Sequence, residues 1–355
     1  MITESFNCSI KYLQIMNEDG EIDQTLIPQD ITDSKILEMY KGMVLARAVD
    51  AKVLSLQRQG RAVTYAPLLG EEATQIGTAM AMRKQDIFVP AFRQHGVFIE
   101  RSVPIDALFI YWRGFEEGNV FPKEVNAFPI IVPVATQMPH ATGIAFAQRY
   151  LKKDSAVLVY VGDGGTSEGD FYEAINFAGV WKVPLITIIE NNQWAISLPR
   201  NEQTSAKTLA QKGVAVGIDS IQVDGNDVLA VYKATRDAIA NSNKGPMIIE
   251  CITYRMGLHT TSDDPTKYRS DSEVEAWKRK DPIERVKKYL IKKGVWDEIK
   301  EQQELEAVSK LVDNAVEKAE KFKPDPRSMF STVYSFMPQV LRDEFDEAEA
   351  NNFWQ

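Results

Sequence analysis

The sequence predicts an α/β fold, with a mostly parallel sheet flanked by helices and followed by a C-terminal helical extension. Five short apolar segments rich in β-branched residues read as strands, at residues 87–89, 156–161, 185–190, 218–223 and 247–254. Segments with helical spacing of apolar residues lie between them, and such alternation is typical of a parallel sheet covered on both faces. After residue 275 the strands stop, and Lys- and Glu-rich sequence with helical spacing follows.

The chain is therefore divided into an N-terminal arm (1–31), an α/β domain (32–275) and a helical extension (276–355). In the arm, the turn signal at 17–20 predicts a small hairpin or an extended segment. Thr32 is placed to cap a helix that runs to about Gln59 and is ended by Gly60. In the extension, apolar residues spaced i, i+1, i+4, i+5 and i+8 predict one helix face, made of Met329, Phe330, Val333, Tyr334 and Met337.

The remaining helices follow from the same signals. A helix is expected to begin at 70–72, and others to cover 104–113 and 227–241. Pro139 opens a helix that reaches about Leu151. Ser167, with Asp170 three positions later, is expected to cap the helix between the strands 156–161 and 185–190.

This central strand–helix–strand unit carries the chemistry. The first strand ends in a glycine-rich turn, residues 162–165, and the second ends in Asn191-Asn192. Because the strands are expected to be parallel, Asp163 and Asn192 should meet at the carboxyl edge of the sheet, where α/β proteins bind ligands.

A glycine-rich turn before a helix N-terminus is a seat for phosphate. Asp163 would repel a phosphate, and a divalent cation such as Mg²⁺ resolves that conflict, because it binds carboxylate, amide and phosphate oxygens together. Asn192 could supply an amide oxygen, and a carbonyl of the following loop another. On spacing alone, an ordinary surface turn is equally compatible. A dinucleotide site fits less well, since Ser167 replaces its third glycine, although Glu190 stands near the position of a ribose-binding acid.

Composition argues against several classes of function. The net charge of −9 disfavours nucleic acid as a partner, and no apolar run is long enough to span a membrane. The first residues lack the pattern of a signal or transit peptide. The two cysteines, Cys8 and Cys251, rule out a disulfide framework, so a reducing cytoplasm is the expected location.

Several motifs together resemble one family. Gly162-Asp163-Gly164 followed after 26 residues by Asn191-Asn192 is similar to the signature of thiamine-diphosphate enzymes. AFRQHG (91–96), ATQMPHATG (135–143), NNQWAIS (191–197) and YRMGLHTTSDDPTKYRS (254–270) resemble the α subunit of the E1 component of 2-oxo acid dehydrogenase complexes. The resemblance runs from about residue 12 to the end, and it implies the thiamine-diphosphate-binding fold, with thiamine diphosphate and Mg²⁺ as cofactors.

The resemblance also implies a set of site residues. The metal ligands would be the side chains of Asp163 and Asn192 and the carbonyl of Trp194. His259 would be catalytic, beside the diphosphate. His95 could equally face the cofactor or pack, and His140 is expected to be structural. Phe92 stands where the family usually has tyrosine, so only ring packing would remain there. The whole cofactor-binding set is Phe92, Arg93, Val132, Val134, Asp163, Gly164, Gly165, Asn192, Trp194, Ile196, Arg255 and His259.

Within that set, each type of residue has an expected task. Arg93 and Arg255 would contact phosphate. The main chain at Val132 and Val134 would hold the aminopyrimidine ring, and Ile196 would wedge between the two rings of the cofactor. Without the family, these three apolar residues would be read as ordinary core.

Partners and substrate follow from the same resemblance. No glutamate stands in the family context of the one that activates the cofactor, and in similar enzymes it belongs to a β subunit. An α₂β₂ heterotetramer that feeds a lipoyl-bearing E2 acyltransferase is therefore expected. YAPLLGEEA (65–73) and GDGGTSEGDFYEAINFAG favour pyruvate as the 2-oxo acid, whereas ATQMPHATG, VDGNDVLAVY and FSTVYSFMP resemble the branched-chain type. Ala66 replaces a histidine of mitochondrial pyruvate enzymes.

Two further expectations concern the same chain. A noncatalytic cofactor-binding or regulatory subunit is the alternative from another class, and the intact Asp163, Asn192, Arg93 and His259 speak against it. The polar segment 255–271 is expected to be mobile until cofactor binds, with Asp263 and Asp264 paired to nearby bases. Thr260 and Ser262 lie where mitochondrial relatives are phosphorylated.

Overall fold

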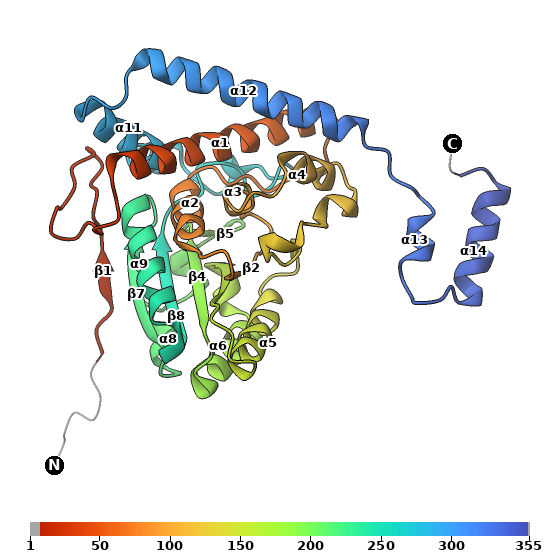
Figure 1. Ribbon diagram of the computed structural model, residues 1–355, viewed down its shortest axis with the longest axis horizontal. Helices are drawn as coiled ribbons and strands as arrows, with labels where there is room; N and C mark the ends of the chain where they lie inside the picture. Colours follow the sequence, from red (N-terminus) through yellow and green to blue (C-terminus); the bar gives the residue numbers. More distant parts are fainter. Residues whose placement is uncertain (1–7, 354–355) are drawn as a thin grey trace.

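The computed structural model describes residues 8–353, and its centre is a six-stranded parallel sheet (Figure 1). The strand order is β1-β7-β8-β4-β3-β2, and every pairing in this sheet is parallel. The strands are β1 (Lys11–Leu13), β2 (Ile87–Val89), β3 (Val157–Gly162), β4 (Leu185–Asn191), β7 (Asp219–Asp224) and β8 (Met247–Ile252). The predicted parallel sheet is confirmed. Residues 1–7 of the predicted arm and 354–355 of the predicted extension lie outside the described residues.

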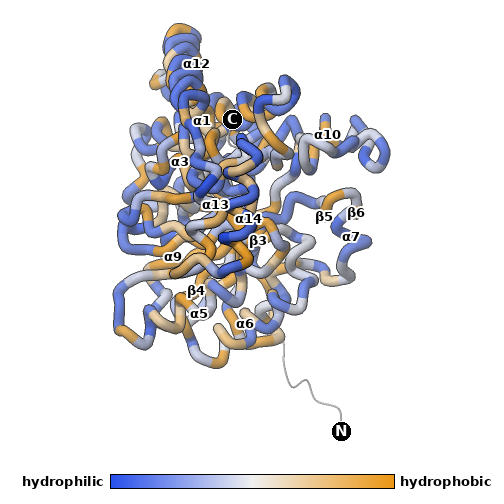
Figure 2. The backbone as a smooth tube through the Cα atoms, turned by 90° about the vertical axis from the view of Figure 1, so that its right-hand side faces the viewer, coloured by the Kyte–Doolittle hydropathy of each residue, from blue (hydrophilic) through white to orange (hydrophobic). Residues whose placement is uncertain are grey.

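Helices cover both faces of the sheet, which explains why the central strands are apolar at nearly every position. Val157 and Val159 pack with α5 (Gln137–Tyr150) and α6 (Gly169–Trp181). Leu158 and Tyr160 point the other way, into the larger core formed with α1 (Asp33–Arg58), α2 (Glu72–Ala81) and α9 (Val228–Ala240). Hydrophobic residues are concentrated in these layers, whereas much of the C-terminal part is hydrophilic (Figure 2).

The other α-helices lie around this core, except α13 and α14, which lie apart from it (Figure 1). They are α3 (His95–Glu100), α4 (Ile105–Trp112), α7 (Arg200–Gln203), α8 (Gln211–Val214), α10 (Asp271–Lys278), α11 (Pro282–Lys292), α12 (Glu298–Lys321), α13 (Ser328–Ser331) and α14 (Gln339–Ala350). Thr32 caps α1 as predicted, because its Oγ1 accepts from the Lys35 N–H at 3.3 Å.

Two predicted helix starts are wrong. α5 begins at Gln137 rather than at Pro139. Ser167 does not cap α6, since a 3₁₀ turn, η3 (Gly164–Ser167), uses these residues first and Glu168 becomes the N-cap residue. The N-cap of α6 therefore lies one residue later than predicted, because the turn after β3 includes Ser167.

The N-terminal arm completes the sheet. β1 lies beside β7 as the edge strand, and the predicted turn follows it, closed by an antiparallel bridge between Met16 and Ile22. The buried Asp227 carboxylate accepts the N–H groups of Ile15 and Met16 at 2.6 and 2.7 Å. The arm is thus held by backbone pairing at the sheet and by this carboxylate.

The C-terminal part is helical, as predicted, but only its first half packs on the domain. α11 and α12 lie along α1, and α12 also contacts α4 (Figure 1). The boundary predicted between residues 275 and 276 falls inside α10. The predicted helix face from Met329 to Met337 is wrong, since α13 ends at Ser331 and Met329, Val333 and Tyr334 are exposed. An apolar face stabilises a helix only where it packs, and these side chains do not.

Candidate active site

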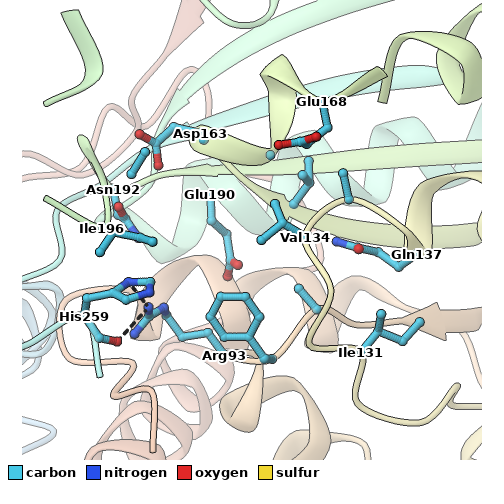
Figure 3. A pocket seen from close by; sticks show the side chains of 18 of the residues that line it. Arg93, Ile131, Val134, Gln137, Asp163, Glu168, Glu190, Asn192, Ile196 and His259 are labelled. Atoms are coloured by element: carbon cyan, nitrogen blue, oxygen red, sulfur yellow. Dashed lines mark hydrogen bonds between the residues drawn. The ribbon is translucent and has the colours of Figure 1, made fainter. Parts of the chain in front are cut away.

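A cavity of about 250 Å³ opens at the carboxyl ends of β2, β3 and β4 (Figure 3). Its walls come from segments far apart in the sequence: Glu71 before α2, residues 91–94 after β2, most of the loop 131–137, residues 161–165 and 168 around the end of β3, residues 190, 192 and 194–196 around the end of β4, and His259 from the loop after β8. The expected meeting of Asp163 and Asn192 at this edge is confirmed, because β3 and β4 are neighbours in the sheet.

Most of the predicted cofactor-binding residues line this cavity. They are Phe92, Arg93, Val134, Asp163, Gly164, Gly165, Asn192, Trp194, Ile196 and His259. Two are not among its lining residues. Val132 is exposed on the adjoining loop, and Arg255 is fully buried, where it donates to the carbonyls of Trp194 and Ile196 at 3.1 and 2.7 Å. Arg255 thereby holds the segment that carries the predicted metal-binding carbonyl.

Two glycines of the turn after β3, Gly164 and Gly165, leave no room for side chains. A Cβ on Gly164 would lie 2.8 Å from the Cβ of Ala195, and one on Gly165 would lie 2.6 Å from Cγ2 of Val161. The Thr166 hydroxyl closes the turn by donating to the Asp163 carbonyl at 2.7 Å. The turn is therefore built so that backbone, rather than side chain, borders the cavity at these positions.

Asp163 presents an unsatisfied carboxylate. Its side chain is 2% exposed, and its Oδ2 has no hydrogen-bond partner among the described residues. Burial raises the pKa of Asp163 to about 6, although Arg255, Arg200 and backbone N–H groups oppose the rise. At neutral pH the group is therefore mostly ionised. A buried, unpaired carboxylate oxygen is costly unless a cation or donor meets it.

Asn192 is held at both ends of its amide. Its Nδ2 donates to Oε1 of Glu71 at 2.7 Å, and its Oδ1 accepts from the Trp194 N–H at 3.3 Å. The oxygens of Asp163 and Asn192 and the carbonyl of Trp194 are hard ligands of the kind that Mg²⁺ prefers. The donor set thus fits the cation expected from the sequence.

Arg93 and His259 lie side by side at the cavity wall and are joined by hydrogen bonds (Figure 3). Nη2 of Arg93 lies 3.2 Å from Nδ1 of His259 and donates to its carbonyl at 3.1 Å, and Nη1 of Arg255 lies 3.4 Å from the same Nδ1. Because guanidinium groups only donate, Nδ1 is the acceptor and the proton of the neutral ring sits on Nε2. Burial, followed by the charges of Arg93 and Arg255, lowers the pKa of His259 to about 3.

Two strained residues also border the cavity. Ala135 and Ile196 both have positive φ, at 65° and 58°, which is uncommon for alanine and an outlier for a β-branched residue. Ile196 stands at the turn of the small hairpin formed by β5 (Trp194–Ala195) and β6 (Leu198–Pro199), and its side chain is 56% exposed. Ile196 is therefore not ordinary core, and strain of this kind gathers at functional sites.

The loop 255–271 is tied down by polar contacts. Asp263 accepts the His259 N–H at 2.8 Å and the Tyr268 hydroxyl, so its expected pairing with a basic side chain is wrong. Arg269 donates to the carbonyls of Met256 and Gly257, both at 3.1 Å. These contacts fix the backbone on both sides of His259.

Three glutamates of the cavity were not predicted as site residues: Glu71, Glu168 and Glu190. Glu71 and Glu190 are almost fully buried, and burial raises the pKa of both carboxyls, with Glu71 adding to the rise at Glu190. Glu190 could have been found from its place two residues before Asn192. Glu71 begins a helix elsewhere in the sequence, and nothing local connects it to the site.

His95, which the sequence left open, packs rather than lining the cavity. Its ring stacks on Tyr65 at 5.1 Å and meets the edge of Trp112 at 5.3 Å. Burial lowers the pKa of His95 to about 3, with Arg93 adding to the effect. His140 lies outside the cavity as well, with Nδ1 2.7 Å from the Thr136 carbonyl.

Comparison with known proteins identifies relatives over most of the chain. The model of the family "Dehydrogenase E1 component" matches residues 40–327. A protein of Staphylococcus aureus (strain Mu50 / ATCC 700699), named pyruvate dehydrogenase E1 component subunit alpha, is 42% identical over 339 residues, which cover 94% of this chain and 91% of that protein. A protein of the same name from Staphylococcus epidermidis (strain ATCC 12228 / FDA PCI 1200) is similar to the same extent, again 42% identical over 94% of this chain and 91% of its own length.

Proposed function

The chain belongs to the dehydrogenase E1 component family, and from that premise we propose that it is the α subunit of the E1 component of a pyruvate dehydrogenase complex. Together with a β subunit it carries out the thiamine-diphosphate-dependent oxidative decarboxylation of pyruvate and passes the acyl group to the lipoyl group of E2. The observation that carries the proposal is the unpaired, buried Asp163 carboxylate oxygen, beside a glycine turn and Asn192 in one cavity.

The residues present fit thiamine diphosphate with Mg²⁺. Asp163 and Asn192, with the Trp194 carbonyl, hold the cation, and Arg93 offers a fixed positive charge to the diphosphate. When bound, thiamine diphosphate would supply the nucleophilic carbon for attack on the 2-oxo carbon of the substrate. Val134 and Ile196 offer exposed apolar side chains at the cavity wall to the rings of the cofactor.

His259 is the residue that we assign to catalysis. Since arginine donors occupy Nδ1, its Nε2–H is the group free to donate. A neutral imidazole held in one tautomer donates a hydrogen bond to a substrate oxygen without competing as a second cation for the diphosphate. Arg255 supports this role because its guanidinium contacts both Nδ1 of His259 and the Trp194 carbonyl, which fixes their positions.

An exposed aromatic surface supports assembly with other subunits. The cluster consists of Phe146 on α5 and Phe177 and Trp181 on α6, each 40% exposed or more. The ring centroid of Trp181 lies 4.6 Å from that of Phe146 and 4.7 Å from that of Phe177. Clustered exposed aromatics are typical of protein interfaces. We infer an α₂β₂ heterotetramer in which the β subunit supplies the glutamate that activates the cofactor.

The assembly is proposed to act in the cytoplasm. Both Cys8 and Cys251 are free. Across residues 8–353, the structure contains no helix long and apolar enough to span a membrane. We also propose that the chain is organised as an N-terminal arm (1–31), an α/β domain (32–275) and a helical extension (276–355).

Steady-state turnover tests the proposal. The chain is purified with its β subunit, and activity is measured on pyruvate and on 3-methyl-2-oxobutanoate with thiamine diphosphate and Mg²⁺. A higher kcat/KM on pyruvate is expected. A preference for the branched acid would assign the branched-chain type instead, and cofactor binding without turnover of either acid would indicate a noncatalytic subunit. Binding of NAD without binding of thiamine diphosphate would overturn the family chemistry altogether.

A further inference from the structure

Glu71 is a buried carboxylate that contacts a predicted metal ligand through a side-chain hydrogen bond. Its side chain is 1% exposed, and its Oε1 accepts from Nδ2 of Asn192 at 2.7 Å. The same oxygen lies 3.8 Å from Nε of Arg93. Glu71 thus stands between the residue expected to bind the cation and the residue expected to bind the diphosphate.

This contact decides which way the Asn192 amide points. An amide can present either its oxygen or its nitrogen to a neighbour, and the hydrogen-bond network selects between them. In its ionised form a carboxylate only accepts, and Oε1 of Glu71 accepts here from Nδ2, so the nitrogen faces Glu71 and the oxygen faces away from it. Among the described residues, the oxygen then has a single donor, the Trp194 N–H at the long distance of 3.3 Å, which leaves it free to bind a cation beside Asp163 (Figure 3).

The turn that carries Glu71 is itself fixed. Gly70 has φ of 103°, and a Cβ there would lie 2.1 Å from the Tyr254 carbonyl. The Gly70 carbonyl accepts from the Thr253 hydroxyl at 2.6 Å, and its N–H donates to Glu72 at 3.0 Å. Because the turn is packed directly against the end of β8, Glu71 cannot follow Asn192 if the amide rotates.

We propose that Glu71 is a positioning residue for the metal site, which orients the amide oxygen of Asn192 toward the cation. The inference rests on the proposed function, since it assumes that Asn192 is a metal ligand. Partners that orient a ligand in this way typically change metal affinity by about 10- to 100-fold when they are removed.

A second glutamate–asparagine pair offers a matched control. Asn191 donates from Nδ2 to Oε1 of the fully buried Glu250, also at 2.7 Å. This pair joins β4 to β8 next to Asn192, but neither Asn191 nor Glu250 lines the cavity. Glu250→Met therefore removes a bond of the same type, length and burial, together with the bonds that Glu250 accepts from the Ala210 N–H and from Gln222, without touching the predicted metal ligand.

The experiment measures the Mg²⁺ dissociation constant by calorimetry in the α–β assembly saturated with thiamine diphosphate. Glu71→Met should weaken Mg²⁺ binding by about 10- to 100-fold. Glu71→Gln keeps an acceptor oxygen, so its Mg²⁺ affinity should fall by less than about tenfold. Glu250→Met should lower the melting temperature and leave the dissociation constant close to that of the unaltered protein.

The outcomes separate the two hypotheses. Unchanged Mg²⁺ affinity in Glu71→Met, or an equal loss in Glu250→Met, would overturn the positioning role while leaving the proposed function intact. If Glu71→Met does not fold, the comparison of Glu71→Gln with Glu250→Gln takes its place, and the former alone should weaken Mg²⁺ binding. An unaltered assembly that binds no Mg²⁺ with thiamine diphosphate would overturn the proposed function and this inference with it.

Discussion

Mg²⁺ binding should depend on pH through Asp163. The carboxyl is almost completely buried, and its pKa is raised from 3.8 to about 6. Its ionised form binds the cation, so Mg²⁺ affinity should be nearly constant above pH 7 and fall as the pH drops through 6. Between pH 7 and pH 5 the ionised fraction falls about tenfold, equivalent to about 1.4 kcal/mol of binding free energy. A carboxyl with the ordinary pKa would lose almost nothing over the same range.

The assay compares the unaltered protein with Asp163→Asn, in the α–β assembly saturated with thiamine diphosphate. The variant keeps an amide oxygen but loses the charge, and at pH 7 it should bind Mg²⁺ more than about tenfold more weakly, because one charge beside a cation is worth several kcal/mol. The diphosphate and the other ionisable groups of the cavity, Glu71 and Glu190 among them, are present in both proteins. The ratio of the two dissociation constants therefore isolates the effect of the Asp163 charge, and this ratio should shrink about tenfold between pH 7 and pH 5.

Two results would refute this reasoning. A ratio that stays constant from pH 7 to pH 5 would mean that Asp163 ionises normally and is not desolvated as the structure describes. Equal Mg²⁺ affinity of both proteins at pH 7 would remove Asp163 from the metal site. Circular dichroism at each pH checks that both proteins remain folded.

Three further predictions concern the partner, the loop and the core. The purified chain alone should not decarboxylate pyruvate, and adding the β subunit should restore activity; turnover by the chain alone would show that one of its own cavity glutamates suffices. Proteolysis within 255–271 should be slowed by thiamine diphosphate with Mg²⁺, because ligands near His259 add to the contacts that hold the loop, and equal cleavage rates would exclude cofactor gating. The pKa of the buried His95 is lowered, so the stability that its neutral ring contributes is lost as the pH falls below the unfolded-state pKa of about 6.5. Between pH 7 and pH 5, the free energy of unfolding of His95→Phe should therefore rise by about 2 kcal/mol relative to that of the unaltered protein. Denaturant melts at both pH values measure this difference, and a difference that does not change with pH would contradict the prediction.

The sequence was informative where local pattern and a general rule of topology acted together. β3 and β4 are visible as apolar segments, and the rule that adjacent parallel strands end at one edge is enough to bring Asp163 to Asn192. The Thr32 cap was predicted correctly for the same reason, since a cap is decided by neighbours three residues away.

The sequence did not predict the position of a residue where contacts with distant parts of the chain determine that position. Glu71 reaches Asn192 across 121 residues, and no local signal marks that contact. The place of Arg255 is set by the Trp194 and Ile196 carbonyls of the neighbouring hairpin, which no local signal indicates. The spacing of Met329 to Met337 was helical, but a pattern does not create the surface on which such a helix could pack.

The position of β1 has a consequence for biosynthesis. Lys11 pairs with Ile221, and Gln14 bonds to Asp224, 210 residues further along the chain. At about 5 to 20 residues per second, the first strand to leave the ribosome waits roughly 10 to 40 seconds before its partner strand exists. The sheet therefore cannot close this edge until β7 has been made, so β1 reaches its final place long after it has been synthesised.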